Sequence, residues 1–336
     1  MSKPQINNGA FLNQSSNRVF GKDNRLYLMG FSMLWIVLFH ISFWFHLGGQ
    51  GNTPWWINMF SEGQLGVDIF LFLSAYGLEA SFDKNTIHRF YLNRIKRLFP
   101  VYFFFLLFLF VTFERNCPIE RIIIQCVCQI TGLSLIKYPY FFSSGFCFDW
   151  FTPAIIIVYV SFPLISYVAR FVEDKNKYWE FLLLLFIVVI GHWIHVNKHF
   201  SFSLLAYRGP IILMGVLTFR HLQRGDIERL LELYVIAACL GFLCTEKSII
   251  LSLLVPSVLL VFSLTNCALP FTKLFSIIGK YSYEVYLAHI FFVAFFIPMG
   301  MVKNPLALLL VVFGGSALVA ILLSFLHNCF YKCICH

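Results

Sequence analysis

Charged residues are scarce in this chain. Only 12% of its 336 residues are Asp, Glu, Lys or Arg, whereas 59% are hydrophobic. So few charges cannot cover the surface of a soluble domain of this length, which excludes the ordinary soluble folds. The apolar residues instead gather in runs of nearly twenty, long enough to cross a bilayer core of about 30 Å as a helix. The sequence therefore predicts an all-α, polytopic membrane helix bundle.

Other features are missing as well. Residues 1–24 are polar and contain no apolar stretch typical of a cleavable signal peptide, so we expect them to form a cytoplasmic tail. The ten cysteines lack the spacing of a disulfide framework, and only the stretch with Cys117, Cys126, Cys128 and Cys147 leaves room for one disulfide. The ending Cys329-x3-Cys333-x-Cys335-His336 has no second ligand cluster, so we expect no metal.

Basic residues outnumber acidic ones, 25 to 16. They are spread over short loops rather than gathered in one footprint, so a nucleic-acid partner is not expected. Anionic membrane lipids are their expected partners. We place about ten spans within a transmembrane domain of residues 25–328, which a short tail (329–336) follows. The expected spans are 28–46, 64–82, 98–114, 151–169, 180–196, 202–219, 230–245, 248–264, 281–299 and 306–327.

The segment 119–136 is ambiguous because it is apolar but carries Arg121, Gln125 and Gln129. Cytoplasmic loops are enriched in Lys and Arg, and this rule decides the case. Five basic clusters fall on one side of the membrane only if 119–136 does not cross. We therefore expect both termini to be cytoplasmic and 116–149 to be an outward-facing re-entrant or interfacial stretch.

Two ionisable side chains are predicted at one depth in the first two spans. His40 lies about 18 Å beyond Leu28, at 1.5 Å of rise per residue, and Asp68 lies near the outer end of the second span. A carboxylate beside an imidazole can orient the ring and leave its other nitrogen as a base, so both are candidate catalytic residues. Glu79, eleven residues after Asp68, shares its helical face. The alternatives are a packing hydrogen bond for His40 and a helix N-terminal charge for Asp68.

Further polar residues suggest ligand contacts. Arg94 and Arg97 lie three residues apart on one face, and Pro100 is expected to shape the turn into the third span. Such a guanidinium pair suits phosphate groups, either of lipids or of a phosphorylated cofactor. Three residues of the ninth span form a polar stripe that should face the bundle interior, and two arginines lie at the start of spans. These candidates are Ser282, Tyr286, His289, Arg25 and Arg208.

Several segments, taken in order, resemble the acyltransferase-3 family of integral membrane acyltransferases. The first span ends in a histidine. Gly66-Val67-Asp68-Ile69-Phe70-Leu71-Phe72-Leu73-Ser74 is similar to the family's GVDxFFxLSG, which adds Ser74 to the candidates. Phe90 to Pro100 is similar to F-x-x-R-R-x-x-R-I-x-P, and Gly279 to His289 to G-x-x-S-Y-x-[IV]-Y-L-x-H.

Two departures from the family pattern stand out. Where members commonly carry Arg or Lys, eleven residues before the histidine, this chain has Met29, and Arg25 lies one turn further out. The carboxylate that a better-known subgroup has near Trp150 is missing, and Asp149 is the nearest substitute.

The resemblance implies transfer of an acyl group, most often acetyl, from cytoplasmic acetyl-CoA or another acyl-CoA to a hydroxyl of a cell-surface or lipid-linked glycan. It also implies a location in the bacterial cytoplasmic membrane. A transporter or flippase without chemistry is the main alternative, because intramembrane polar residues serve translocation equally well. An inert partner of a glycan-assembly complex is the third.

Overall fold

The structure is a computed structural model that describes residues 20–47, 58–113, 118–135, 149–197, 201–244, 247–264, 271–296 and 304–335. Within these ranges all regular secondary structure is helical, which confirms the all-α prediction. The elements are α2 (Lys22–Leu47), η1 (Ser61–Gln64), α4 (Leu65–Lys84), α5 (Ile87–Phe113), α6 (Ile119–Thr131), η2 (Leu133–Leu135), α7 (Phe151–Lys175), α8 (Lys177–Asn197), α9 (Ser201–Ala206), α10 (Gly209–Arg224), α11 (Ile227–Leu243), α12 (Lys247–Leu264), α13 (Thr272–Lys280), α14 (Ser282–Phe296) and α15 (Pro305–Cys335).

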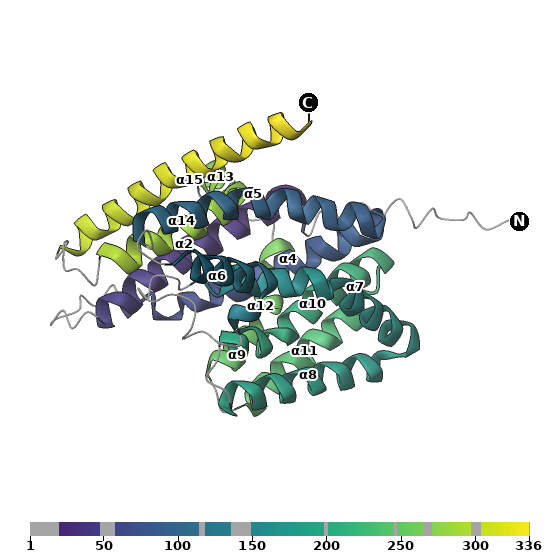
Figure 1. Cartoon of the computed structure of the whole chain (residues 1–336). Coiled ribbons are helices and arrows are strands. Elements are labelled where there is room, and N and C mark those ends of the chain that lie inside the picture. The colour runs from purple at the N-terminus through teal and green to yellow at the C-terminus, as the bar shows by residue number, and fades with distance from the viewer. Residues whose placement is uncertain are drawn as a thin grey trace, which may run out of the picture.

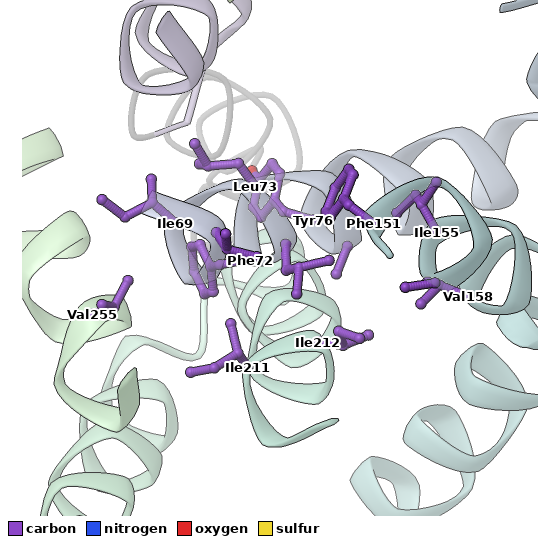
Figure 2. Close-up of a cluster of buried hydrophobic side chains, with 14 of the residues drawn as sticks. Ile69, Phe72, Leu73, Tyr76, Phe151, Ile155, Val158, Ile211, Ile212 and Val255 are labelled. Atoms are coloured by element: carbon purple, nitrogen blue, oxygen red, sulfur yellow. The ribbon is translucent and has the colours of Figure 1, made fainter. Parts of the chain in front are cut away.

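The helices form a bundle in which α15 lies along one edge and α8 along the opposite edge (Figure 1). Near its middle, α4 packs against α7, α10 and α12. Figure 2 shows the core there: Phe72 of α4 points toward Ile211, and the same buried cluster includes Ile69, Leu73, Tyr76, Phe151, Ile155, Val158, Ile212 and Val255. A helix enclosed in this way can hold ionisable side chains away from lipid, which is where the candidate residues of α4 lie.

The outer helices present apolar side chains outward. On α8, exposed residues include Trp179, Phe186 and Trp193, and on α15 they include Leu310 and Leu318. Contiguous exposed apolar surface of this kind is typical of a lipid-facing wall. Among the described residues, six segments are long and apolar enough to cross a membrane: Lys22–Phe43, Ser61–Lys84, Phe151–Lys175, Lys177–Asn197, Phe202–Arg224 and Leu306–Lys332.

The helices extend or divide differently from the expected spans at three places. Pro100 lies inside α5 rather than in a turn, so the basic stretch from Phe90 onward is helical and continuous with the third expected span. The expected span 202–219 lies within the candidate span Phe202–Arg224, which consists of two helices, α9 and α10, that meet at Tyr207–Arg208. The expected tail 329–336 is helical as far as Cys335, as part of α15.

The ambiguous segment 119–136 contains α6, which has 13 residues and ends at Gly132 in the left-handed conformation (φ 79°). A helix of this length rises about 20 Å, which is short of a core of about 30 Å. Its apolar side chains Ile119, Ile123 and Ile124 point outward and are exposed, whereas Gln125 and Gln129 are buried. Cys126 and Cys128 are free thiols, and Cys117 and Cys147 lie outside the described residues.

A close helix crossing joins α2 to α13. A Cβ atom added at Gly30 would lie 1.8 Å from the carbonyl oxygen of Phe275, and one added at Gly279 would lie 1.9 Å from that of Leu26. Only glycine allows the two backbones to approach so closely, a packing mode common between membrane helices. The crossing fixes the start of α14 relative to α2, and both helices carry a candidate histidine.

Candidate functional site

The two candidate histidines of α2 and α14 face each other. Nε2 of His289 lies 3.3 Å from Nδ1 of His40, and the ring centroids are 5.1 Å apart. His289 is fully buried and His40 is partly exposed. Each ring is also anchored to its own helix: Nδ1 of His40 is 2.9 Å from the carbonyl oxygen of Ile36, and Nδ1 of His289 is 3.3 Å from that of Val285.

These contacts determine where the protons lie when both rings are neutral. A carbonyl oxygen can only accept, so Nδ1 carries the hydrogen in each ring. The Nδ1–H of His40 then donates to two acceptors, the carbonyl oxygen of Ile36 and Nε2 of His289. Nε2 of His40 keeps its lone pair, and no described residue donates a hydrogen bond to it. An oriented imidazole with one free basic nitrogen is the arrangement that general-base catalysis requires.

Asp68 is not the partner of His40, contrary to the prediction. Its Oδ1 accepts a hydrogen bond from Nε of Arg208 at 2.9 Å, and its Oδ2 accepts one from Oγ of Ser252 at 2.9 Å. Asp68 and Arg208 are 1% and 3% exposed. Both carboxylate oxygens are therefore occupied, and the ion pair joins α4 to α10 and α12.

The direction of Asp68 follows from the glycine two residues before it. Gly66 faces α2, because a Cβ atom added there would lie 2.6 Å from the carbonyl oxygen of Ser32. Asp68 lies about 200° further around the helix, at 3.6 residues per turn, so it points away from α2. Arg208 is also occupied: its guanidinium lies 4.3 Å from the Tyr207 ring centroid and 5.5 Å from that of Trp150.

The polar stripe of α14 faces the interior, as predicted: Ser282 and His289 are fully buried and Tyr286 is 6% exposed. The Tyr286 hydroxyl donates to Oδ1 of Asp149 at 3.0 Å, and the backbone N–H of Thr152 donates to the same oxygen at 3.0 Å. Burial raises the pKa of the Asp149 carboxyl above its ordinary value, although these hydrogen bonds act in the opposite direction. The Ser282 hydroxyl has no partner among the described residues.

A basic pocket of about 250 Å³ lies near the N-terminal end of α2. The described residues that line it include four cationic side chains and no carboxylate. We define the basic pocket by its lining residues Lys22, Arg25, Leu26, Met29, Leu73, Ser74, Gly77, Leu78, Arg94, Arg97 and Tyr159. Three elements supply the charged groups and the hydroxyl: α2, α4 and α5. The pocket thus unites four predicted residues, Arg25, Ser74, Arg94 and Arg97.

Among the described residues, no carboxylate forms an ion pair with the cations of the basic pocket, although Glu284 interacts with Arg97 at longer range. Nε of Arg25 and Nε of Arg94 are buried without a hydrogen-bond partner. Burial lowers the pKa of the Arg94 guanidinium and the like charge of Arg97 adds to this effect, while Tyr159 partly offsets it. Buried cations without a counter-ion are unfavourable unless an anion binds to them. The pocket therefore suits a phosphate group.

Gly77 makes room for Arg25, since a Cβ atom there would lie 2.7 Å from a terminal nitrogen of that guanidinium. Met29, which stands where the family commonly has a basic residue, lines the same pocket one turn along α2. Arg25 therefore brings a cation to the pocket that Met29 cannot.

Glu79 does not share a cavity with Asp68. Its Oε1 accepts from Arg170 at 3.0 Å and from Arg220 at 3.3 Å. Arg220 also bonds to Glu173, and Arg229 binds Glu180 at 2.6 Å. This ion network joins the ends of α4, α7, α8, α10 and α11, and its carboxylates and guanidiniums nearly balance in charge. Glu79 is thus a structural cross-link in this arrangement.

Sequence reasoning missed Ser252, the second partner of Asp68, because a serine in an apolar helix carries no distinctive signal. The sequence identifies Asp149 as the nearest substitute for the subgroup's carboxylate but does not place it in the predicted site. Tyr159 of α7 was also missed: it lines the basic pocket but belongs to no motif that the sequence offers. In the described part of the chain, no group of three or more His, Cys, Asp and Glu side chains is arranged to hold a metal ion.

Fold and geometry define the class: a multi-pass integral membrane protein with an imidazole pair between α2 and α14 and a separate basic pocket. The family model described as an acyltransferase domain matches residues 27–325. The chain belongs to the acyltransferase-3 family. No curated protein and no solved structure gives a match.

Proposed function

We propose that this family member is a membrane O-acyltransferase that moves an acyl group, acetyl in the simplest case, from a cytoplasmic acyl-CoA to a hydroxyl of a cell-surface or lipid-linked glycan. One observation carries the proposal: the His40–His289 contact engages Nδ1 of His40 and leaves its Nε2 without a hydrogen-bond donor in the described part of the chain. The basic pocket supports the proposal because its distance from the base suits a long donor. Arg25, in the pocket, precedes His40 by 15 residues on α2, which corresponds to a rise of about 22 Å along the helix. The donor's phosphates and its thioester thus have separate places along α2.

The basic pocket is the proposed site for the phosphates of the donor. Arg94 and Arg97 supply planar donor groups that bind phosphate oxygens bidentately, Lys22 and Arg25 add charge, and Ser74 adds a hydroxyl. Coenzyme A thioesters carry several phosphate charges on a long flexible arm, so the reactive end can lie far from the anchored end. The phosphate of a lipid headgroup would satisfy the same charges, and the coenzyme A affinity of Arg97→Ala distinguishes the two ligands.

In the proposed reaction, Nε2 of His40 takes the proton of the acceptor hydroxyl as its oxygen attacks the thioester carbonyl. The new C–O bond forms, the C–S bond breaks, and the coenzyme A thiolate leaves and takes up the proton. His289 stabilises the imidazolium form of His40, because its Nε2 accepts the Nδ1–H. Tyr286, bonded to Asp149, packs beside His289 with ring centroids 5.5 Å apart and holds it in place.

The proposed topology has ten spans with both termini in the cytoplasm and 116–149 outside, in a bacterial cytoplasmic membrane. The support is the one-sided distribution of basic residues. In this orientation the basic pocket opens toward the cytoplasm, where acyl-CoA is made, and His40 lies nearer the outer face, where the glycan is.

The test uses purified protein reconstituted in vesicles with radiolabelled acetyl-CoA and glycan from the parent cells. The proposal predicts label on the glycan as a base-labile ester, in amounts that depend on the protein. Glycan that crosses the bilayer without gaining label would support a transporter and overturn the proposal.

A further inference from the structure

The helix α6 carries a buried amide that the protein does not satisfy. Gln125 is 1% exposed, yet neither its Nε2 nor its Oε1 has a hydrogen-bond partner among the described residues. Its neighbour one turn on, Gln129, is satisfied: Oε1 accepts from the Tyr102 hydroxyl at 3.2 Å and from Ser134 at 3.2 Å. Burying a polar group without a partner is unfavourable, so the two glutamines need different explanations.

A second unpartnered atom belongs to the same polar region. Oδ2 of Asp149 is buried without a hydrogen bond, although Oδ1 is bonded to Thr152 and Tyr286. Tyr102, which binds Gln129, also interacts with the Asp149 carboxyl group. Tyr102 thus connects the inner face of α6 to Asp149. Asp149 in turn binds Tyr286, which packs against His289 of the imidazole pair.

We infer that Gln125 and Asp149 form a binding subsite for the hydroxyl groups of the acyl acceptor, a sugar. The inference rests on the proposed function and names a part of its acceptor site. A sugar hydroxyl both donates and accepts hydrogen bonds. Oδ2 of Asp149 and Oε1 of Gln125 accept, while Nε2 of Gln125 donates, so the unused atoms match this chemistry in both directions.

The placement of α6 favours a sugar that is reached from the membrane-facing side. Its outward face consists of exposed apolar residues such as Ile123, Ile124 and Val127, while its glutamines point inward. Because its apolar side chains face outward and its glutamines face inward, α6 presents its amide groups to the bundle core. The sugar can arrive on a lipid or as part of a soluble glycan, and the experiment separates these sources.

The experiment uses membranes from cells that lack their own copy of the protein, supplemented with the full-length wild type or with Gln125→Met. Radiolabelled acetyl-CoA is added, and label is measured in organic-extractable lipid-linked glycan and in water-soluble glycan. Gln125→Met keeps the side-chain length and removes the amide. We expect about three- to tenfold less acceptor labelling at limiting acceptor, the effect of losing one or two hydrogen bonds. Thr131→Val, which removes a hydroxyl from the exposed side of α6, should label like the wild type.

Two readouts that do not depend on the acceptor complete the test. Coenzyme A affinity should be equal in all three proteins. The thermal stability of ligand-free Gln125→Met should equal or exceed that of the wild type, because an unsatisfied amide is removed, whereas a structural glutamine would lower it. Wild-type labelling by Gln125→Met, or its destabilisation, would overturn the subsite. If the wild type labels no glycan at all while coenzyme A still binds, the proposed function fails rather than the subsite alone. Label found only in soluble glycan assigns the source without affecting the subsite.

Discussion

His289 takes the role that the sequence had suggested for Asp68. A carboxylate and an imidazole can both accept the Nδ1–H of His40, but only His289 lies within reach of it, at 3.3 Å. Asp68 instead joins α4 to the start of α10 through Arg208 and to α12 through Ser252, so removing either partner of the ion pair alone should leave an uncompensated charge and destabilise the bundle. Loss of activity in an Asp68 variant would therefore report folding as well as catalysis.

Replacing the acceptor nitrogen of His289 tests this assignment. His289→Phe should lower turnover by at least about tenfold, since the general base loses its orientation. His289→Gln should recover part of the rate because its Oε1 can accept the same hydrogen bond. Single-turnover rates at saturating acetyl-CoA are the measurement. His192→Phe, on α8, is the matched control and should retain the wild-type rate. Equal rates for the Phe and Gln variants would contradict an orienting role.

The basic pocket yields a second prediction. Arg97→Ala should weaken coenzyme A binding by about tenfold, because a charge-assisted hydrogen bond to phosphate is lost. Arg97→Lys should restore only part of the affinity, since the planar fork is absent. Isothermal titration with purified protein measures this. Arg89→Ala, on the same helix but outside the pocket, should bind normally. Unchanged affinity in Arg97→Ala would leave lipid headgroups as the ligand.

Hydropathy predicted where helices exist but not where they break. The apolar run at 202–219 is continuous, yet Tyr207 and Arg208 interrupt it because Arg208 is drawn to Asp68 and to two aromatic rings. The rise per residue gives an expected depth for Asp68 but not its direction, which Gly66 determines through the α2 contact. By contrast, local spacing did predict that Arg94 and Arg97 share a face and that the α14 stripe points inward.

The close crossing of α2 and α13 gives a prediction about helix packing. Gly279→Ala would place a methyl group 1.9 Å from the Leu26 carbonyl oxygen, so the helices must separate. We expect a loss of about 1–3 kcal/mol of unfolding free energy, the usual cost of overpacking. Gly314→Ala, in α15, has no atom within 4 Å of the added group and should be neutral or stabilising. Thermal unfolding of the two variants in one detergent measures the difference. Equal stabilities would contradict the crossing.

The arrangement of the full chain across the membrane follows from charge rather than from any single helix. The ion network around Glu79 and the basic pocket both lie where the predicted cytoplasmic clusters occur, at the ends of α4, α7 and α10 and at the start of α2. In the proposed topology, both groups of charges lie next to cytoplasmic water, and the imidazole pair lies deeper in the membrane. This asymmetry is what a reaction with a cytoplasmic donor and an external acceptor requires.

Cysteine accessibility tests the topology. In intact cells, a membrane-impermeant maleimide should modify a variant that retains only Cys147 and should spare one that retains only Cys333, because 116–149 is proposed to be outside and the C-terminus inside. After permeabilisation, both should react. Modification of Cys333 in intact cells would contradict the proposed orientation.

The rate of acyl transfer by His40→Gln is the most direct test. Radiolabelled acetyl-CoA is supplied to the purified variant in lipid vesicles with glycan acceptor, and ester formation is compared with that of the wild type at equal protein and equal coenzyme A affinity. Glutamine keeps a hydrogen-bonding side chain but cannot take a proton at neutral pH. A general base at Nε2 predicts that turnover falls by about 10²–10⁴-fold while donor binding is unchanged. Transfer at the wild-type rate would contradict the assignment of His40 as the base.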